Sequence, residues 1–183
     1  MLAQLCVILI ASSWPSRWTP DQVQTANKIV AFSEMHNLDS KEMVAIAWIE
    51  TRLRPQAISP TRDFGLFQIN CRVWHDRLGY PNIEDCYLGM LDYQTNIEAA
   101  AFILILYRGK YRQCRGSKVY MCYNGGPGYS RSKNIEKIKR YRRRVRLIKR
   151  QMRRWIYFKS LTAESSKVSS LEITTNSFSV MIT

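Results

Sequence analysis

One glutamic acid lies on an apolar segment, in a setting that suits acid–base chemistry. Three apolar residues, Met43, Ile46 and Ala47, precede Glu50 by seven, four and three positions. In a helix these positions share one face with Glu50, and that face is the apolar, buried one. A carboxyl there loses hydration, so we expect a raised pKa and an acid still protonated near neutral pH. The alternative is a side chain that reaches water or pairs with an arginine just after it.

Two further motifs follow Glu50-Thr51 in order: Gly65-Leu66-Phe67-Gln68 and Tyr123-Asn124-Gly125-Gly126. Together the three resemble the soluble lytic transglycosylase (SLT-type) domain of the lysozyme-like superfamily. The pattern of that family is Glu-Ser, then Gly-Leu-Met-Gln, then Tyr-Asn-Ala-Gly. Any one motif alone is weak, whereas three in this order are a strong signal. The resemblance extends over roughly residues 19–148.

The resemblance implies a mainly α, lysozyme-like helical domain that cleaves the MurNAc-β-1,4-GlcNAc bond of peptidoglycan. A single acid, Glu50, would protonate the leaving oxygen and then accept a proton from the muramyl 6-hydroxyl, leaving a 1,6-anhydro end. The chemistry implied needs no metal and no cofactor. The residues that the resemblance assigns to substrate binding are Thr51, Gly65, Phe67, Gln68, Glu98, Tyr123 and Asn124.

Several of these residues carry specific expectations. Gln68 should hydrogen-bond a sugar N-acetyl or hydroxyl group, and Phe67, in place of the usual Met, should offer an apolar wall to a sugar. Tyr123 should orient the Glu50 carboxyl, and Asn124 should shape the adjacent subsite. The alternative for Tyr123 and Asn124 is a helix-terminal turn packed on the core.

Two positions leave more room for interpretation. Thr51 keeps the hydroxyl of the usual Ser, so we expect a similar hydrogen bond. In many relatives an acid at the position of Glu98 lies near the site, although a plain structural hydrogen bond explains it equally well.

Asp63 departs from the common family pattern, because many transglycosylases have a small residue two positions before the motif glycine. The run from Asp63 to Asn70 is similar to the turn of animal-type lysozymes and, equally, to specialised transglycosylases of secretion, conjugation and phage machines. A second carboxylate could stabilise the sugar cation or position water. The runner-up function is therefore lysozyme-type hydrolysis by Glu50 and Asp63.

The distribution of charge gives a second, independent indication of the partner. The 183 residues carry a net charge of +14, and residues 108–159 hold 19 of the 28 basic residues against one acid, Glu136. Such asymmetry predicts an anionic partner. A nucleic-acid-binding or structural protein would explain the charge but not the three motifs, so we expect peptidoglycan as the partner and not nucleic acid. Residues 142–159 are expected to dock on an anionic envelope surface.

Cysteine usage suits an enzyme of the cell envelope with two disulfides. Four of the five cysteines lie in the body of the chain, and the most economical pairing is Cys71–Cys86 with Cys114–Cys122. Four cysteines allow three pairings, and buried free thiols are the alternative. The resemblance implies a periplasmic, secreted or virion-associated protein, either a monomer or a component of a larger machine.

Helix signals divide the chain into three parts. Residues 1–16 form an apolar segment, read as a signal or weak anchor, residues 19–150 the catalytic domain, and residues 151–183 a basic, aromatic helix end with a Ser/Thr-rich tail. Within the domain we expect helices from Thr19 to about His36, Asp39 to about Leu53, Asp92 to Tyr107 and Ser117 to Tyr123. Residues 74–85 should form a loop, and a long basic helix should follow Asn134.

Overall fold

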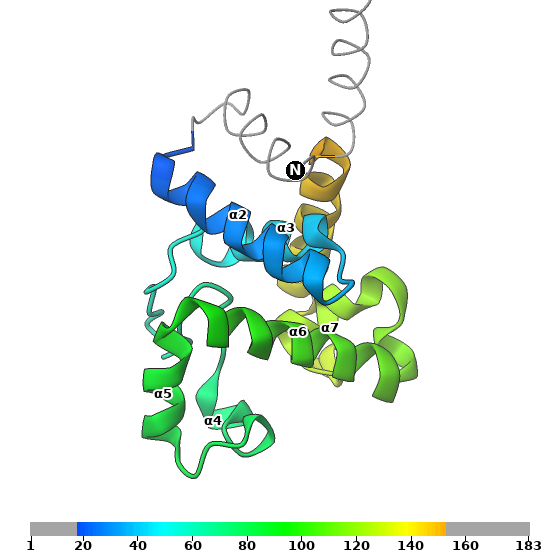
Figure 1. Ribbon diagram of the computed structural model, residues 1–183. Helices are drawn as coiled ribbons and strands as arrows, with labels where there is room; N and C mark the ends of the chain where they lie inside the picture. Colours follow the sequence, from blue (N-terminus) through cyan, green and yellow to red (C-terminus); the bar gives the residue numbers. More distant parts are fainter. Residues whose placement is uncertain (1–17, 153–183) are drawn as a thin grey trace, which may run out of the picture.

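The computed structural model describes residues 18–152, so the N-terminal apolar segment and the Ser/Thr-rich tail lie outside the described residues. Within that range the architecture is helical (Figure 1), which confirms the predicted fold class. The extended backbone there comprises isolated bridges that join Phe64 to Ile58 and to Ile69. Between residues 18 and 152, no helix is both long and apolar enough to cross a membrane.

Two capped helices form the first layer. Helix α2 (Pro20–Met35) begins with the predicted capping box, in which Thr19 and Gln22 satisfy each other's backbone amides. Helix α3 (Ser40–Thr51) is capped by Asp39 and packs against α2. It ends at Thr51, before the expected Leu53, because Arg52 and Leu53 both adopt left-handed backbone conformations. Glu50 therefore lies in the last turn of α3.

The expected loop at residues 74–85 is partly wrong. Helix α4 (Cys71–Trp74) and the 3-10 turn η1 (Asp76–Leu78) lead into helix α5 (Ile83–Leu91), which is capped by Asn82. The predicted Cys71–Cys86 disulfide joins α4 to α5. Sequence periodicity missed α5 because it is short and its buried side is narrow, with Cys86 and Met90 as its buried residues.

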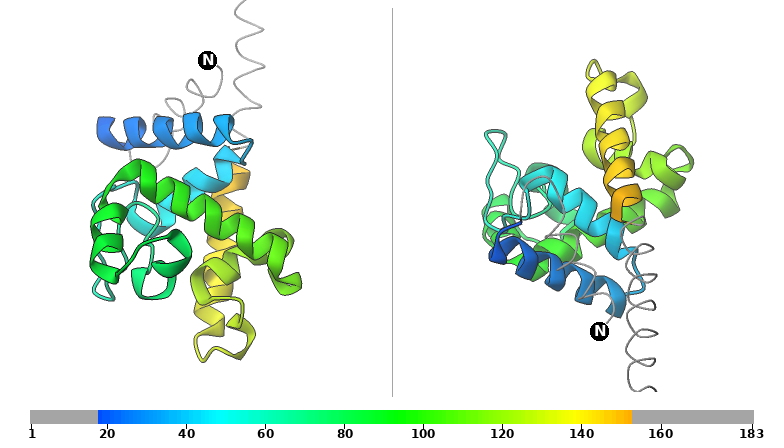
Figure 2. Two further views of the ribbon diagram at one scale, coloured as in Figure 1. Left: turned by 60° about the horizontal axis from the view of Figure 1, so that its bottom comes forward. Right: turned by 90° about the horizontal axis from the view of Figure 1, so that it is seen from above.

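Helix α6 (Tyr93–Lys110) crosses the centre of the molecule (Figures 1 and 2), with Asp92 as its N-cap. The helices α4 and α5 lie at one end of it, and α7 lies near the other (Figure 1). Most of its apolar residues are buried, as predicted. It is not buried all round, however, because Phe102 and Ile105 are exposed on its outer face.

The last part of the described chain packs the basic helix onto this core. The 3-10 turns η2 (Arg112–Cys114) and η3 (Gly116–Lys118) lead into helix α7 (Val119–Gly125), and η4 (Tyr129–Arg131) follows. The predicted Cys114–Cys122 disulfide closes this region. A further helix spans residues 135–152, called here the basic helix, and buries Ile138, Tyr141, Val145, Ile148 and Met152.

A buried amide holds the turn that follows α3. The Asn96 side chain on α6 accepts a hydrogen bond from the Phe67 backbone amide at 2.7 Å and donates to the backbone carbonyls of Phe64 and Met90. Gly65 has φ +73°, and a Cβ there would lie 2.1 Å from the Met90 carbonyl oxygen. The close approach that Asn96 requires is thus available only to glycine.

We predict that Asn96→Ala lowers the free energy of unfolding by about 3 kcal/mol, because it leaves the buried Phe67 amide without its partner and removes the bonds that Asn96 donates to the Phe64 and Met90 carbonyls. Urea denaturation measures the change. Gln94→Ala is the matched control, since that exposed amide on the same helix bonds only an exposed carboxylate, and it should cost well under 1 kcal/mol. Equal losses in the two variants would contradict the role given to Asn96.

Candidate active site

Glu50 is a partly buried acid at the end of α3. Burial is the largest cause that raises its pKa, which reaches about 7 from an ordinary value of 4.5. The negative charge of Asp63 raises it further, whereas a hydrogen bond from Tyr141 and the charges of Arg144 and Lys137 lower it. The raised pKa expected from the apolar helix face is therefore confirmed.

The hydroxyl that orients this carboxyl belongs to the basic helix. Tyr141 donates a hydrogen bond to Glu50 Oε1 at 2.6 Å. The sequence assigned this role to Tyr123, but the Tyr123 hydroxyl donates instead to the Phe67 carbonyl oxygen at 2.8 Å. Tyr123 therefore ties α7 to the turn after α3, and the orienting role predicted for it is wrong.

Asp63 lies in the turn that follows α3, and three side-chain donors hold its carboxylate. Thr61 Oγ1 and Ser59 Oγ donate to Oδ2 at 2.7 and 3.2 Å, and Asn70 Nδ2 donates to Oδ1 at 2.7 Å. These bonds fix the carboxylate and leave fewer of its lone pairs for attack on a sugar carbon. Asp63 is thus arranged to supply a fixed negative charge near Glu50.

A cleft of about 390 Å³ brings the two carboxyls together with the later motif. Gln68, Tyr123 and Asn124 line it, as does the glycine pair after Asn124. The remaining lining residues include an apolar and aromatic group, which comprises Ile69, Val73, Trp74, Ile103 and Tyr107. Such side chains can stack on sugar faces while the carboxyls and amides address their hydroxyl groups.

Gln68 presents one end of its amide to this cleft. Its Nε2 donates to the backbone carbonyls of Gly65 and Ala57, at 2.9 and 3.1 Å. Its backbone is left-handed, with φ 54°, which sets the direction of the side chain. Because the nitrogen is occupied, the amide oxygen is the end available to accept a hydrogen bond from a substrate.

Four of the residues expected to contact substrate do not line the cleft. The Phe67 side chain is fully buried, so it packs in the core and offers no wall to a sugar. Thr51 is buried and donates to the Leu66 carbonyl at 2.9 Å, and Gly65 is enclosed by Met90 and Asn96. These three residues shape the turn. Glu98 is exposed and accepts a hydrogen bond from Gln94, which agrees with its alternative structural reading.

Three residues that the sequence reasoning did not assign to the site also matter. Tyr141 binds the acid, Asn96 holds the turn, and Asn70 bonds Asp63. The Asn70 amide oxygen is buried beside the cleft with no partner among the described residues. Tyr141 carried only a packing signal in its helical period, and its contact with Glu50 spans 91 positions of sequence.

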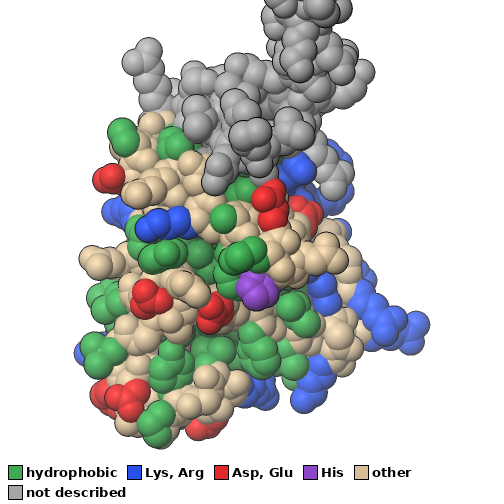
Figure 3. Space-filling view, in the orientation of Figure 1, with side chains coloured by type: hydrophobic (Ala, Val, Ile, Leu, Met, Phe, Trp, Pro, Cys, Tyr) green, Lys and Arg blue, Asp and Glu red, His purple; other side chains and the backbone are tan. Residues whose placement is uncertain are grey.

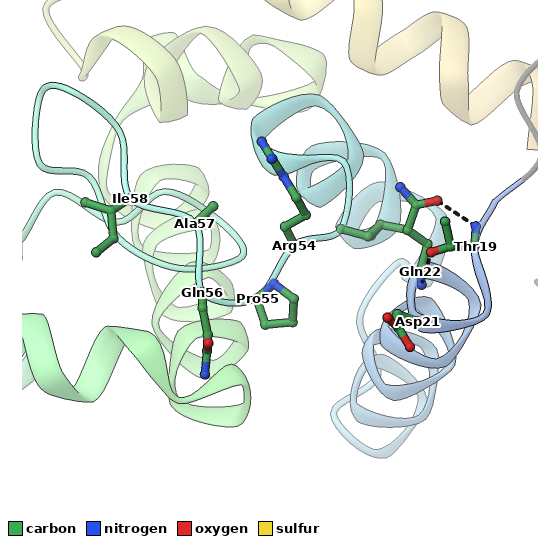
Figure 4. A pocket seen from close by; sticks show the side chains of 9 residues that line it. Thr19, Asp21, Gln22, Arg54, Pro55, Gln56, Ala57 and Ile58 are labelled. Atoms are coloured by element: carbon green, nitrogen blue, oxygen red, sulfur yellow. Dashed lines mark hydrogen bonds between the residues drawn. The ribbon is translucent and has the colours of Figure 1, made fainter.

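A larger cavity, of about 670 Å³, lies between the start of α2 and the segment after α3 (Figure 4). Its carboxyl group is that of Asp21, in the first turn of α2, and Gln22 spans from α2 to the Arg52 carbonyl. Neither Glu50 nor the Tyr123 motif borders it. By volume alone this cavity would be the first choice for a substrate site. The smaller cleft is the better candidate because it contains Glu50, the carboxyl suited to acid–base chemistry. Between residues 18 and 152, no group of three or more His, Cys, Asp or Glu side chains is placed to hold a metal ion.

Comparison with known families covers the region that holds this site. The family model described as the transglycosylase SLT domain matches residues 28–144, a span that contains Glu50, the Gly65 turn, Tyr123 and Tyr141. The chain belongs to this SLT family. Its function is accordingly of the lytic transglycosylase type, the degradation of cell-wall peptidoglycan, which fits action outside the cytoplasm. A search of curated proteins finds no match to this chain.

The raised pKa of Glu50 predicts that the free energy of unfolding falls as the pH rises towards and above neutrality. The folded protein binds this proton more tightly than the unfolded chain, so the stability that Glu50 contributes is fully present below pH 4.5 and is lost as the pH rises through about 7. Glu50→Gln should escape that loss. Above pH 7 we expect the variant to be more stable than the wild type by roughly 3 kcal/mol, relative to their difference at pH 4.

Urea unfolding at several pH values measures this difference. Glu136→Gln is the control, because that fully exposed carboxyl has a lowered pKa, from its bond to Lys139, and should give no divergence between pH 5 and 8. Parallel curves for Glu50→Gln and the wild type over the same range would contradict the burial of Glu50.

Tyr141→Phe should raise the pKa of Glu50 further, because the hydroxyl removed stabilises the ionised carboxylate. Carbon-13 NMR of the Glu50 carboxyl, followed against pH, measures this independently of catalysis. Tyr123→Phe is the matched control, since its hydroxyl bonds the Phe67 carbonyl and not Glu50. A larger upward shift in Tyr123→Phe than in Tyr141→Phe would reverse the two assigned roles.

Proposed function

We propose that the protein is a lytic transglycosylase that cleaves the MurNAc-β-1,4-GlcNAc bond with Glu50 as its single acid and base. The observation that carries the proposal is a carboxyl with a pKa of about 7, inside the cleft that the three family motifs form. At neutral pH such a group exists in both protonation states. It is therefore matched both to donate a proton and to accept one.

The steps follow from that property. Protonated Glu50 gives its proton to the glycosidic oxygen as the bond from that oxygen to C1 of the muramyl residue breaks. The resulting carboxylate takes the proton of the muramyl 6-hydroxyl, whose oxygen bonds C1 of the same sugar. The products are a free 4-hydroxyl on the departing strand and a 1,6-anhydro end, and Glu50 is protonated again.

The surroundings of the acid suit each step. Tyr141 holds Oε1, which leaves Oε2 as the oxygen free to transfer the proton. The fixed charge of Asp63 disfavours ionisation of Glu50 and would stabilise a cationic C1. Gln68, from the second motif, and Asn124, from the third, both line the cleft and offer polar contacts to the sugars.

Lysozyme-type hydrolysis by Glu50 and Asp63 is the second candidate, because Asp63 lines the same cleft and its charge acts on Glu50. The three side-chain donors on Asp63 favour an electrostatic role over direct attack. In the transglycosylase reaction the nucleophile comes from the substrate, so Asp63 needs neither to attack nor to activate water.

Mass analysis of the fragments released from purified peptidoglycan distinguishes the two reactions. We expect the wild type to release 1,6-anhydro ends and Glu50→Gln to lose at least about a thousandfold in rate, since the proton donor is gone. Asp63→Asn should keep anhydro products at a reduced rate. Reducing ends from the wild type would instead establish hydrolysis.

A further inference from the structure

A basic cavity lies apart from the catalytic cleft, between the end of α6, the turn η3 and the basic helix. Its volume is about 420 Å³. In Figure 3, Lys and Arg side chains gather on the side of the molecule where α7 and the end of α6 lie. Four basic side chains and two hydroxyl groups line the cavity: Arg108, Arg146, Lys149, Arg150, Ser117 and Tyr120.

The basic helix separates this cavity from the acid. Arg146 and Arg150 are four residues apart and so share one face of the helix. Arg144, whose charge acts on Glu50, is two residues from Arg146 and so points to roughly the opposite side. The buried stripe that includes Tyr141 runs between the two faces. The cavity is thus a separate site and not an extension of the cleft.

The carboxylates near this cavity are already engaged. Buried Glu42 pairs with Arg108, and Asp39 pairs with Lys149 at 2.6 Å. Neither Arg146 nor Arg150 pairs with a carboxylate among the described residues, and both side chains are exposed. The two internal pairs therefore fix Arg108 and Lys149 at the cavity, and two guanidinium groups remain available for an anion.

A hydroxyl donor is also held in position. Arg142 donates through Nε and Nη2 to Ser117 Oγ, at 3.1 and 2.8 Å. Because the Ser117 oxygen accepts both bonds, its own proton is left to donate elsewhere. Lys149 donates to the Tyr120 hydroxyl oxygen at 3.1 Å, and the Tyr120 hydroxyl is also hydrogen-bonded to Glu42.

We propose that this cavity binds a phosphate group. Two free guanidinium groups, each with several donors in a fixed plane, match the oxygens and charge of a phosphate better than those of a lone carboxylate. The phosphate ester would come from an anionic phospholipid headgroup or from a phosphodiester polymer of the cell wall. Binding there would hold the enzyme at the envelope while the cleft on the other side of the basic helix stays open to glycan.

Inorganic phosphate titrated into the full-length protein at about 0.15 M salt, with amide NMR shifts as the readout, tests the site. We expect saturable shifts at Ser117 and in the basic helix around Arg146. The double variant Arg146→Gln/Arg150→Gln should bind at least about tenfold more weakly, because two charge-assisted contacts are lost. It leaves the Arg108–Glu42 and Lys149–Asp39 pairs intact, so the fold should persist.

Arg140→Gln/Arg143→Gln is the matched control, since it removes the same charge from exposed positions of the same helix that do not line the cavity. Equal weakening in both double variants, or acetate binding as tightly as phosphate, would overturn the proposal. So would tighter binding of an oligonucleotide that both double variants reduce alike, because the charge would then act as a diffuse surface.

Two further measurements separate the sources of the phosphate. Co-sedimentation with phosphatidylglycerol vesicles, against phosphatidylcholine vesicles, reports a headgroup, and pull-down on polyglycerol phosphate reports a wall polymer. Loss of whichever binding is seen in Arg146→Gln/Arg150→Gln alone supports the site. Release of soluble glycan fragments should be unchanged in that variant, so failure of the phosphate site and failure of the proposed cleavage reaction are told apart.

Discussion

The chemistry of this protein depends on the removal of water from one carboxyl group. Glu50 lies where the end of α3 meets the basic helix, and this packing keeps it protonated at a pH at which most glutamates are ionised. Two contacts then set its direction and its charge environment. Tyr141 fixes the direction of the carboxyl, and Asp63 supplies a negative charge that opposes its ionisation.

A second constraint fixes the distance from the acid to the substrate-binding turn. Thr51, next to Glu50, bonds the Leu66 carbonyl, while Asn96 on α6 bonds the amide of Phe67. The Tyr123 hydroxyl then bonds the carbonyl of the same Phe67. The turn is therefore held from three helices, and its geometry relative to Glu50 is a property of the whole core. Motif residues that do not line the cleft, such as Thr51 and Gly65, therefore still contribute to the site by fixing the shape of the turn.

Local signals in the sequence predict much of the fold, because caps and apolar periods act within a few residues. The capping box of Thr19, the Asp39 cap and the buried stripe of the basic helix all have this character. The short helix α5 was missed for the converse reason, since too few of its residues are buried to set a period. Both disulfides followed from nearness in sequence, which is itself a local property.

The site itself was predicted less completely, for a physical reason. The apolar face of its own helix indicates that Glu50 is buried, so a raised pKa could be inferred from spacing. The partner of Glu50 could not be, because Tyr141 meets it across 91 residues and two tyrosines were available to do so. Likewise Phe67 reads as an apolar residue at the site, and only tertiary packing shows that it faces the core.

The two disulfides limit the cellular compartments in which the cleft can form completely. Cys71 directly follows Asn70, and Cys122 directly precedes Tyr123, so each cross-link ends one residue from a lining side chain. Thiols in the cytosol are kept reduced, whereas those in the periplasm or outside the cell are oxidised. In a reducing compartment both borders of the cleft would thus lack their cross-links. The same bonds that stiffen the enzyme would delay its maturation until it reaches an oxidising compartment.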